Sequence, residues 1–199
     1  RMPGWCNGAQ VSVCSKSGEK IRISVEKDAL RVETDPIQEG LMSCSLQNGY
    51  LYLTGDWQDE DSIALDFPME VHCVSADARV REDMGKVAFT RGPICYCAEE
   101  ADNGKELHKC SVDIGRMERE GIRMENFDEL GQKMCRLRVP GLRIESMNNG
   151  VGKGMVTAPG LYHDFTRPEE KEITLTLIPY YAWGNRGEGE MSVWLRYSL

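Results

Sequence analysis

Apolar residues alternate with polar residues along most of this chain, and this period of two constrains the fold more than any other feature. It is clear at residues 11–13, 21–25, 30–32, 63–67, 86–89, 135–139, 173–177 and 191–195. Successive side chains of a strand point to opposite faces, so each segment has one apolar face and one polar face. No window of eleven or more residues combines helical apolar spacing with a capping residue ahead of it. The pattern predicts about a dozen short strands in antiparallel sheets.

These strands predict an all-β fold of two antiparallel β-sandwich modules, because about a dozen strands are too many for one seven-stranded sandwich. The apolar run ends after Val74, where residues 75–79 are mostly small or charged. We therefore expect a first module at residues 1–75 and a second at residues 76–199. Residues 100–133 and 145–171 are polar and weakly patterned, which predicts long surface loops or irregular sheet edges there.

Charge and composition exclude several classes of partner. The net charge is −8, from 24 basic and 32 acidic residues, so a phosphate backbone would be repelled and we expect no nucleic-acid partner. No run approaches the roughly 18 apolar residues of a membrane-spanning helix, and we expect no membrane partner. The eight cysteines are predicted to be free, buried thiols, and this thiol content favours a reducing cytoplasm.

No residue combination in the sequence predicts a catalytic or metal site. The sequence has no Gly-x-Ser-x-Gly and no His-Glu-x-x-His motif. His163 and Asp164 are adjacent and would point to opposite faces of a strand. The glycine-rich residues 149–154 lack Walker spacing and predict a hairpin loop. A zinc site made by Cys95, Cys97 and His72 is an alternative, but Cys-x-Cys spacing in apolar segments favours a role in the core.

Two groups of aromatic residues are candidates for binding a sugar, since sugar rings stack on Trp and Tyr. Tyr50 and Tyr52 share a strand face, and residues 180–186 (YYAWGNR) follow a predicted strand. The candidate substrate-binding residues are Tyr180, Trp183, Asn185 and Arg186. Packing of the aromatic rings in the core is the alternative that we favour.

The segment after that strand also carries a resemblance. Residues 178–187 (IPYYAWGNRG) with 191–195 (MSVWL) resemble the carboxyl end of glycoside hydrolase family 127, the β-L-arabinofuranosidases and their relatives. Five further segments are similar to that family in the same order: residues 1–5 (RMPGW), 49–51 (GYL), Trp57, 65–69 (LDFPM) and 91–97 (RGPICYC).

The resemblance implies that this chain holds only part of such an enzyme. In that family an (α/α)6 barrel carries catalysis, with a zinc-bound cysteine thiolate as nucleophile, and two β-sandwich domains follow it. The matched segments belong to the sandwich domains, so no catalytic residue is transferred to this chain. We expect no cofactor in this chain, zinc in the barrel of the longer enzyme, and no activity for this chain alone.

Three hypotheses for function follow. The first is a non-catalytic C-terminal fragment that supports the missing catalytic barrel as its partner. The second is an autonomous carbohydrate-binding module that uses its surface aromatics, and the third, ranked last, is a metal-dependent enzyme. The family's Asn-Gly turn after Val13 is replaced by residues 14–18 (CSKSG). We expect the first module to be incomplete at its N-terminal edge, and either to pair with another copy through exposed strand edges or to fray.

Overall fold

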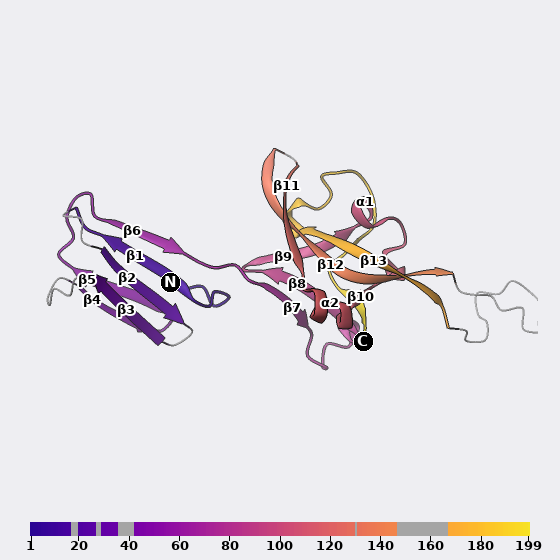
Figure 1. The fold of residues 1–199 in the computed structure, drawn as a ribbon, viewed down its shortest axis with the longest axis horizontal. Helices are drawn as coiled ribbons and strands as arrows, with labels where there is room; N and C mark the ends of the chain where they lie inside the picture. Colours follow the sequence, from indigo (N-terminus) through magenta and orange to yellow (C-terminus); the bar gives the residue numbers. More distant parts are fainter. Residues whose placement is uncertain (17–19, 27–28, 36–41, 130, 147–166) are drawn as a thin grey trace, which may run out of the picture. The chain divides into compact units, whose positions relative to one another are not determined.

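The computed structural model describes residues 1–16, 20–26, 29–35, 42–129, 131–146 and 167–199 (Figure 1). The chain divides into two compact units, unit 1 at Arg1–Glu70 and unit 2 at Val71–Leu199. The glycine-rich residues 149–154 and the His163–Asp164 pair lie outside the described residues. Among the described residues, no helix is long and apolar enough to cross a membrane.

Unit 1 consists of a four-stranded antiparallel sheet, in the order β3-β2-β1-β6, and a two-stranded hairpin of β4 and β5. Its strands are β1 (Ala9–Cys14), β2 (Lys20–Glu26), β3 (Ala29–Asp35), β4 (Met42–Gln47), β5 (Tyr50–Gly55) and β6 (Ser62–Asp66). Asn48 and Gly49 join β4 to β5 with φ of 51° and 75°, the left-handed pair that a tight hairpin turn requires.

The core of unit 1 follows from the alternation in the sequence. Val11 of β1 lies opposite Ile23 of β2, and both are buried with Ala9 and Val25. Leu46 and Leu51 of the hairpin pack against this cluster. Ser12 lies opposite Arg22 on the other face, which explains why every second residue of these strands is polar.

Unit 2 is built on a nine-stranded sheet that pairs with itself. Its strands are β7 (Val71–Ser75), β8 (Lys86–Arg91), β9 (Ile94–Glu99), β10 (Cys110–Asp113), β11 (Arg123–Glu129), β12 (Gln132–Ser146), β13 (Glu169–Pro179), β14 (Met191–Ser192) and β15 (Leu195–Ser198). The order is β14-β9-β13-β12-β10-β15-β8-β7, with β11 paired to β12, and β8 also pairs with β9. That pairing closes six strands into a barrel-like ring.

The all-β prediction is therefore confirmed, with two differences in detail. Unit 2 is a closed sheet, whereas the sequence predicted two stacked sheets. The pair β10–β15 is parallel, although the sequence predicted antiparallel strands throughout. As for the boundary between the units, the sequence places it after residue 75, while the structure divides the chain after Glu70 and pairs β7 with β8 of unit 2.

Most of the described residues of the stretch 100–133 belong to helices and strands, so the prediction of long surface loops or irregular edges there is wrong. This stretch contains α1 (Glu100–Asn103), η2 (Leu107–Lys109), β10, α2 (Ile114–Glu120) and β11. Leu107, Cys110 and Val112 are buried in the main core of unit 2. One further short 3-10 turn, η1 (Arg81–Asp83), precedes β8.

Two side chains explain why this polar stretch is ordered. The carboxylate of Asp113 accepts the backbone N–H of Arg116 at 2.9 Å and so caps α2. The side-chain amide of Asn103 donates to the carbonyl oxygens of Glu99 and Thr176, both at 2.9 Å, and accepts the N–H of Thr176 at 2.8 Å. Asn103 thus fastens α1 to β13 with bonds that replace those of a neighbouring strand.

Candidate functional site

The predicted aromatic segment forms an exposed loop at the end of β13. Residues 175–179 of β13 are buried, and the 3-10 turn η3 (Tyr180–Ala182) follows. Residues three apart eclipse one another in such a turn, and the rings of Tyr180 and Trp183 stack with centroids 6.0 Å apart and planes at 25°. Tyr180, Tyr181 and Trp183 are 45%, 59% and 43% exposed. We call residues 180–190 the aromatic loop.

The sequence-based preference for core packing of the aromatic rings is therefore wrong for this loop, and also for β5. Tyr50 and Tyr52 are about half exposed and lie on one face of that strand, with ring centroids 6.3 Å apart. These two tyrosines belong to unit 1, whereas the aromatic loop belongs to unit 2. The two aromatic groups therefore belong to different units.

Asn185 stabilises the turn of the aromatic loop. Its side-chain amide nitrogen donates to the carbonyl oxygens of Ala182 at 3.1 Å and Trp183 at 3.3 Å. Gly184 follows Trp183 with φ of 79°, a backbone conformation that favours glycine. Asn185 and Gly184 together close the turn that presents the Tyr180–Trp183 stack.

Arg186 forms ion pairs with three carboxylates. Its guanidinium lies among the carboxylates of Glu99 at the end of β9, Asp102 of α1 and Glu129 of β11. Nε donates to Glu99 at 3.0 Å, and Nη1 donates to Asp102 at 3.1 Å and to Glu129 at 3.2 Å. Nη2 donates to both Glu99 and Asp102. These five hydrogen bonds match the five N–H donors of the guanidinium. We call these four residues the Arg186 cluster.

Three of the four side chains of the Arg186 cluster are largely removed from water. The side chains of Glu99, Asp102 and Arg186 are 7%, 16% and 17% exposed. Hydrogen bonds from Arg186 to Asp102 and then to Glu99, together with their charges, raise the pKa of Arg186 above its ordinary value, against the opposing effect of burial. Glu99 also accepts the N–H of Gly184 at 2.9 Å. The cluster therefore fixes the aromatic loop to three separate elements of unit 2.

A second anchor lies at the far end of the aromatic loop. The Glu190 carboxylate accepts the backbone N–H groups of Glu106 at 3.1 Å and Leu107 at 2.7 Å. The Glu190 carbonyl oxygen accepts the N–H of Glu100 at 2.9 Å, and the Glu190 N–H donates to the Glu100 carboxylate at 3.1 Å. The middle of the loop, through Arg186, and its end, through Glu190, are thus both bound to the α1–η2 segment.

Cys97 of β9 lies in a small core that includes Ala182 of the aromatic loop. Cys97 packs with Met134, Ile178 and Ala182. Burial, followed by the charge of Glu99, raises the pKa of Cys97 to about 12, so its thiol stays protonated near neutral pH. All eight cysteines are free, but only Cys97 and Cys110 are buried, and Cys73 is exposed.

These positions do not fit a zinc site at Cys95, Cys97 and His72. His72 is exposed on β7, whereas Cys97 is buried in an apolar core with Met134, Ile178 and Ala182. Glu99, the carboxylate that most affects the charge at Cys97, is already paired with Arg186. In the part of the chain that the structure describes, no group of three or more His, Cys, Asp or Glu side chains is arranged to hold a metal ion.

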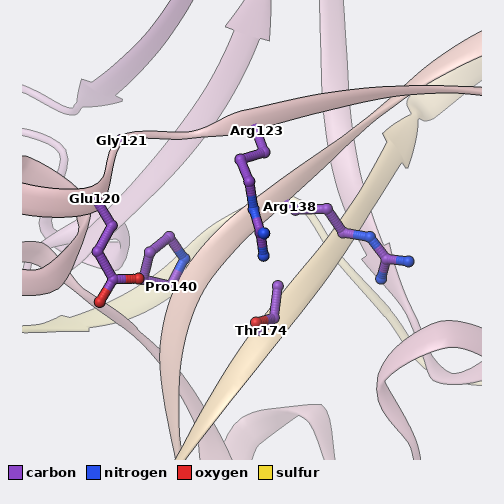
Figure 2. A pocket seen from close by; sticks show the side chains of 6 residues that line it. All are labelled: Glu120, Gly121, Arg123, Arg138, Pro140 and Thr174. Carbon is purple, nitrogen blue, oxygen red and sulfur yellow. The ribbon is translucent and has the colours of Figure 1, made fainter.

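A pocket that sequence reasoning missed lies elsewhere in unit 2. It has a volume of about 180 Å³ and is lined by Glu120, Gly121, Arg123, Arg138, Pro140 and Thr174 (Figure 2). Figure 2 shows the Arg123 side chain extending toward Thr174. Arg138 pairs with Glu125, Nε to Oε2 at 3.0 Å, and Glu120 pairs with Arg116. The pocket contains none of the predicted sugar-binding residues, and no local motif marks it, because three separate strands supply its basic and polar side chains.

Comparison with known proteins defines the class to which this all-β chain belongs. Residues 71–196, nearly all of unit 2, match the family model described as glycoside hydrolase family 127 C-terminal domain. The chain therefore belongs to glycoside hydrolase family 127, which confirms the resemblance found in the sequence.

Relatives support the same assignment. The chain is 37% identical over 153 residues to the non-reducing end β-L-arabinofuranosidase of Bifidobacterium longum, a match that covers 76% of this chain and 22% of that protein. It is similar to the crystal structure of a family 127 β-L-arabinofuranosidase from Geobacillus stearothermophilus T6, with TM-score 0.66 and 30% identity over 100% of this chain and 26% of that one. A second family 127 β-arabinofuranosidase structure matches with TM-score 0.61 and 26% identity, over 96% of this chain and 23% of that one. The chain thus spans about a quarter of the length of these relatives.

Proposed function

We propose that this chain is a non-catalytic C-terminal region of a β-L-arabinofuranosidase-type glycoside hydrolase and that it supports the catalytic barrel of the longer enzyme. The observation that carries the proposal is the match of unit 2 to the family's C-terminal domain. The relatives are named for the arabinofuranosidase activity, and this chain corresponds to 22% to 26% of their length. Catalysis would then belong to the remaining three quarters.

The chemistry of the described residues supports the same division. Cys97 is buried in an apolar core, and Glu99 is paired with Arg186. These groups do not fit the zinc-bound thiolate that the family implies. We therefore assign zinc to the barrel of the longer enzyme and derive no catalytic step from this chain.

The aromatic loop supports a scaffolding role more than a catalytic one. Its polar groups are engaged in the fold: Asn185 holds the turn and Arg186 binds three carboxylates. What the loop presents outward is an ordered apolar surface of Tyr180, Tyr181 and Trp183. Such a rigid aromatic surface suits contact with a neighbouring domain, because ordering it on binding costs little entropy.

A chimera tests the supporting role directly. In the Geobacillus stearothermophilus relative, the matched quarter is replaced by this chain, and the yield of folded protein and hydrolysis of an aryl β-L-arabinofuranoside are measured. We expect the chimera to fold and to hydrolyse the substrate, while the same enzyme truncated before the matched quarter does neither. An inactive, aggregated chimera, no better than the truncation, would contradict the supporting role.

The isolated chain provides the complementary measurement. With and without added zinc, we expect no hydrolysis of the aryl β-L-arabinofuranoside, and no saturable heat in calorimetry against arabino-oligosaccharides. Zinc-dependent turnover would overturn the non-catalytic assignment. Saturable heat that is lost in Trp183→Ala would instead favour the carbohydrate-binding module, an alternative for which the comparisons give no support.

A further inference from the structure

The pocket of unit 2 (Figure 2) has a basic wall that its carboxylates do not fully neutralise. Arg123 of β11 lies directly opposite Arg138 of β12, and both line the pocket. Like charges directly opposite one another in a sheet repel, so this pair favours a negative charge nearby. Glu125 supplies one carboxylate, but its Oε2 accepts from Nε of both Arg136 and Arg138, each at 3.0 Å. One carboxylate is thus shared by two of the three arginines on this face.

Arg123 is the arginine without a carboxylate. It is exposed, and its side chain extends toward Thr174 (Figure 2). Among the described residues, no acidic side chain lies within ion-pairing distance of Arg123. Glu120, the carboxylate that lines the pocket, pairs instead with Arg116, Oε1 to Nε at 3.2 Å. Arg123, with Arg138 beside it, therefore gives the pocket a positive charge that a bound anion can neutralise, in a chain whose net charge is −8.

The other lining residues indicate what the anion carries besides its charge. Pro140 is buried in β12 and gives the pocket an apolar wall, against which C–H groups can pack. Thr174 lies opposite Pro140 on β13, and its hydroxyl can bind a hydroxyl group of a ligand, as can the Glu120 carboxylate. Because Glu120 is itself negative, it also opposes a second negative charge on the ligand. The volume of about 180 Å³ is below the roughly 300 to 1,000 Å³ of pockets for drug-sized ligands, which indicates a small molecule.

We propose that this pocket binds a small organic acid that has one carboxylate and several hydroxyl groups. The carboxylate of the ligand pairs with Arg123 beside Arg138. Its hydroxyl groups bind Thr174 and Glu120, and its C–H groups pack on Pro140. The proposal goes beyond the supporting role and does not depend on it, because all six lining residues belong to unit 2 of this chain. Exposed ion pairs are weak, so we expect a Kd on the order of 1 mM.

An NMR titration of the isotope-labelled chain measures this binding at the pocket itself. Glucuronate is the probe, because it has one carboxylate and several hydroxyl groups. Glucose lacks the carboxylate, acetate lacks the hydroxyl groups, and inorganic phosphate carries a second charge. We expect glucuronate to shift the backbone signals of Gly121 and Arg123 and the Nε–H signal of Arg123 to saturation. It should bind more tightly than each of the other three, at least about fivefold more tightly than glucose, and more weakly as salt rises from about 50 mM to 500 mM.

Variants test which side chains hold the ligand. Arg123→Gln removes the unpaired charge and should weaken glucuronate binding at least about fivefold, while Arg123→Lys keeps the charge without the forked geometry and should be intermediate. Arg22→Gln is the matched control, because Arg22 is an exposed strand arginine of unit 1 and its loss changes the net charge equally; binding should be unchanged. Glu120→Gln removes the charge that opposes phosphate, so phosphate should then bind more tightly than it does to the unmodified chain.

Three results would overturn the proposal. The first is the absence of a saturable shift at Gly121 and Arg123 with glucuronate. The second is binding that glucose matches, or that Arg123→Gln leaves unchanged, since the carboxylate would then not be bound by Arg123. The third is tighter binding of phosphate than of glucuronate by the unmodified chain, which would exclude a singly charged organic acid. Signals from residues far from the pocket report whether each variant is folded, so weaker binding is distinguished from a loss of folding.

Discussion

Replacing Arg186 by methionine should strongly destabilise unit 2. The substitution keeps an unbranched chain of similar reach but removes the only positive charge of the Arg186 cluster. Glu99 and Asp102, with side chains 7% and 16% exposed, would then carry unpaired negative charge in a poorly hydrated site. Removing one partner of a buried ion pair costs about 3 to 5 kcal/mol, so we expect a loss of about 3 kcal/mol or more in the free energy of unfolding.

Two further variants separate charge from packing. Glu129 is 41% exposed, and exposed ion pairs contribute at most about 1 kcal/mol, so Glu129→Gln should cost no more than that. The double variant Arg186→Met with Glu99→Gln removes one stranded charge and should be more stable than Arg186→Met alone. Arg186→Lys should be intermediate, since an ammonium group cannot bind two carboxylates in the forked geometry of arginine.

The measurement must report on unit 2 separately, because two units can unfold independently. Urea unfolding monitored by hydrogen exchange, with mass spectrometry of peptides from β9 and β13, gives the stability of unit 2 alone. A loss below about 1 kcal/mol for Arg186→Met, or an equal loss for Glu129→Gln, would refute the reasoning that buried charge governs this loop.

Other variants of unit 2 give sharp expectations, measured by urea unfolding at fixed temperature. Gly141→Ala should lower the free energy of unfolding by about 1 to 3 kcal/mol, because the new Cβ would lie 2.8 Å from the Ser111 carbonyl oxygen. Gly115→Ala, within α2 and without such a close contact, should leave the free energy of unfolding unchanged or raise it by up to about 1 kcal/mol. Asp113→Ala should cost about 1 kcal/mol through loss of the α2 cap, and an unchanged midpoint would show that the cap is dispensable. The pKa of Cys97 is raised to about 12, against 9.0 for an ordinary thiol, so the unfolded chain loses this proton at a lower pH than the folded chain. The free energy of unfolding therefore falls as the pH rises from about 9 to 12. Cys97→Ala should reduce that slope by up to about 1.4 kcal/mol per pH unit.

Much of the strand content could be predicted from the sequence because burial on one face imposes a period of two. Residues 11–13, 21–25 and 173–177 fall within β1, β2 and β13. Local pattern does not specify which strands pair, and closure of unit 2 depends on the pairing of β8 with both β9 and β15. The residues 191–195, predicted as one strand, are divided between β14 and β15 for the same reason, since the two strands pair with different neighbours.

The ordered stretch at residues 100–133 was missed because distant residues stabilise it. Asn103 binds Thr176, and Glu190 binds the N–H groups of Glu106 and Leu107. Each of these contacts joins groups more than 70 positions apart, and neither leaves a periodic trace in the sequence. Polarity there indicates capping and anchoring side chains, where sequence reasoning interpreted it as solvent exposure.

The aromatic loop shows the limit of interpreting residue types without their partners. Tyr180, Trp183, Asn185 and Arg186 are residue types common in sugar-binding sites, and all four lie on one loop. Asn185 and Arg186, however, direct their donors into the protein, where carbonyl and carboxylate groups accept them. Of these four side chains, the rings of Tyr180 and Trp183 are the exposed ones, and they stack on each other. The polar residues therefore determine the shape of the loop, and its aromatic residues determine what the loop can contact. For this reason, removal of Arg186 should disturb the aromatic surface although Arg186 is not part of that surface.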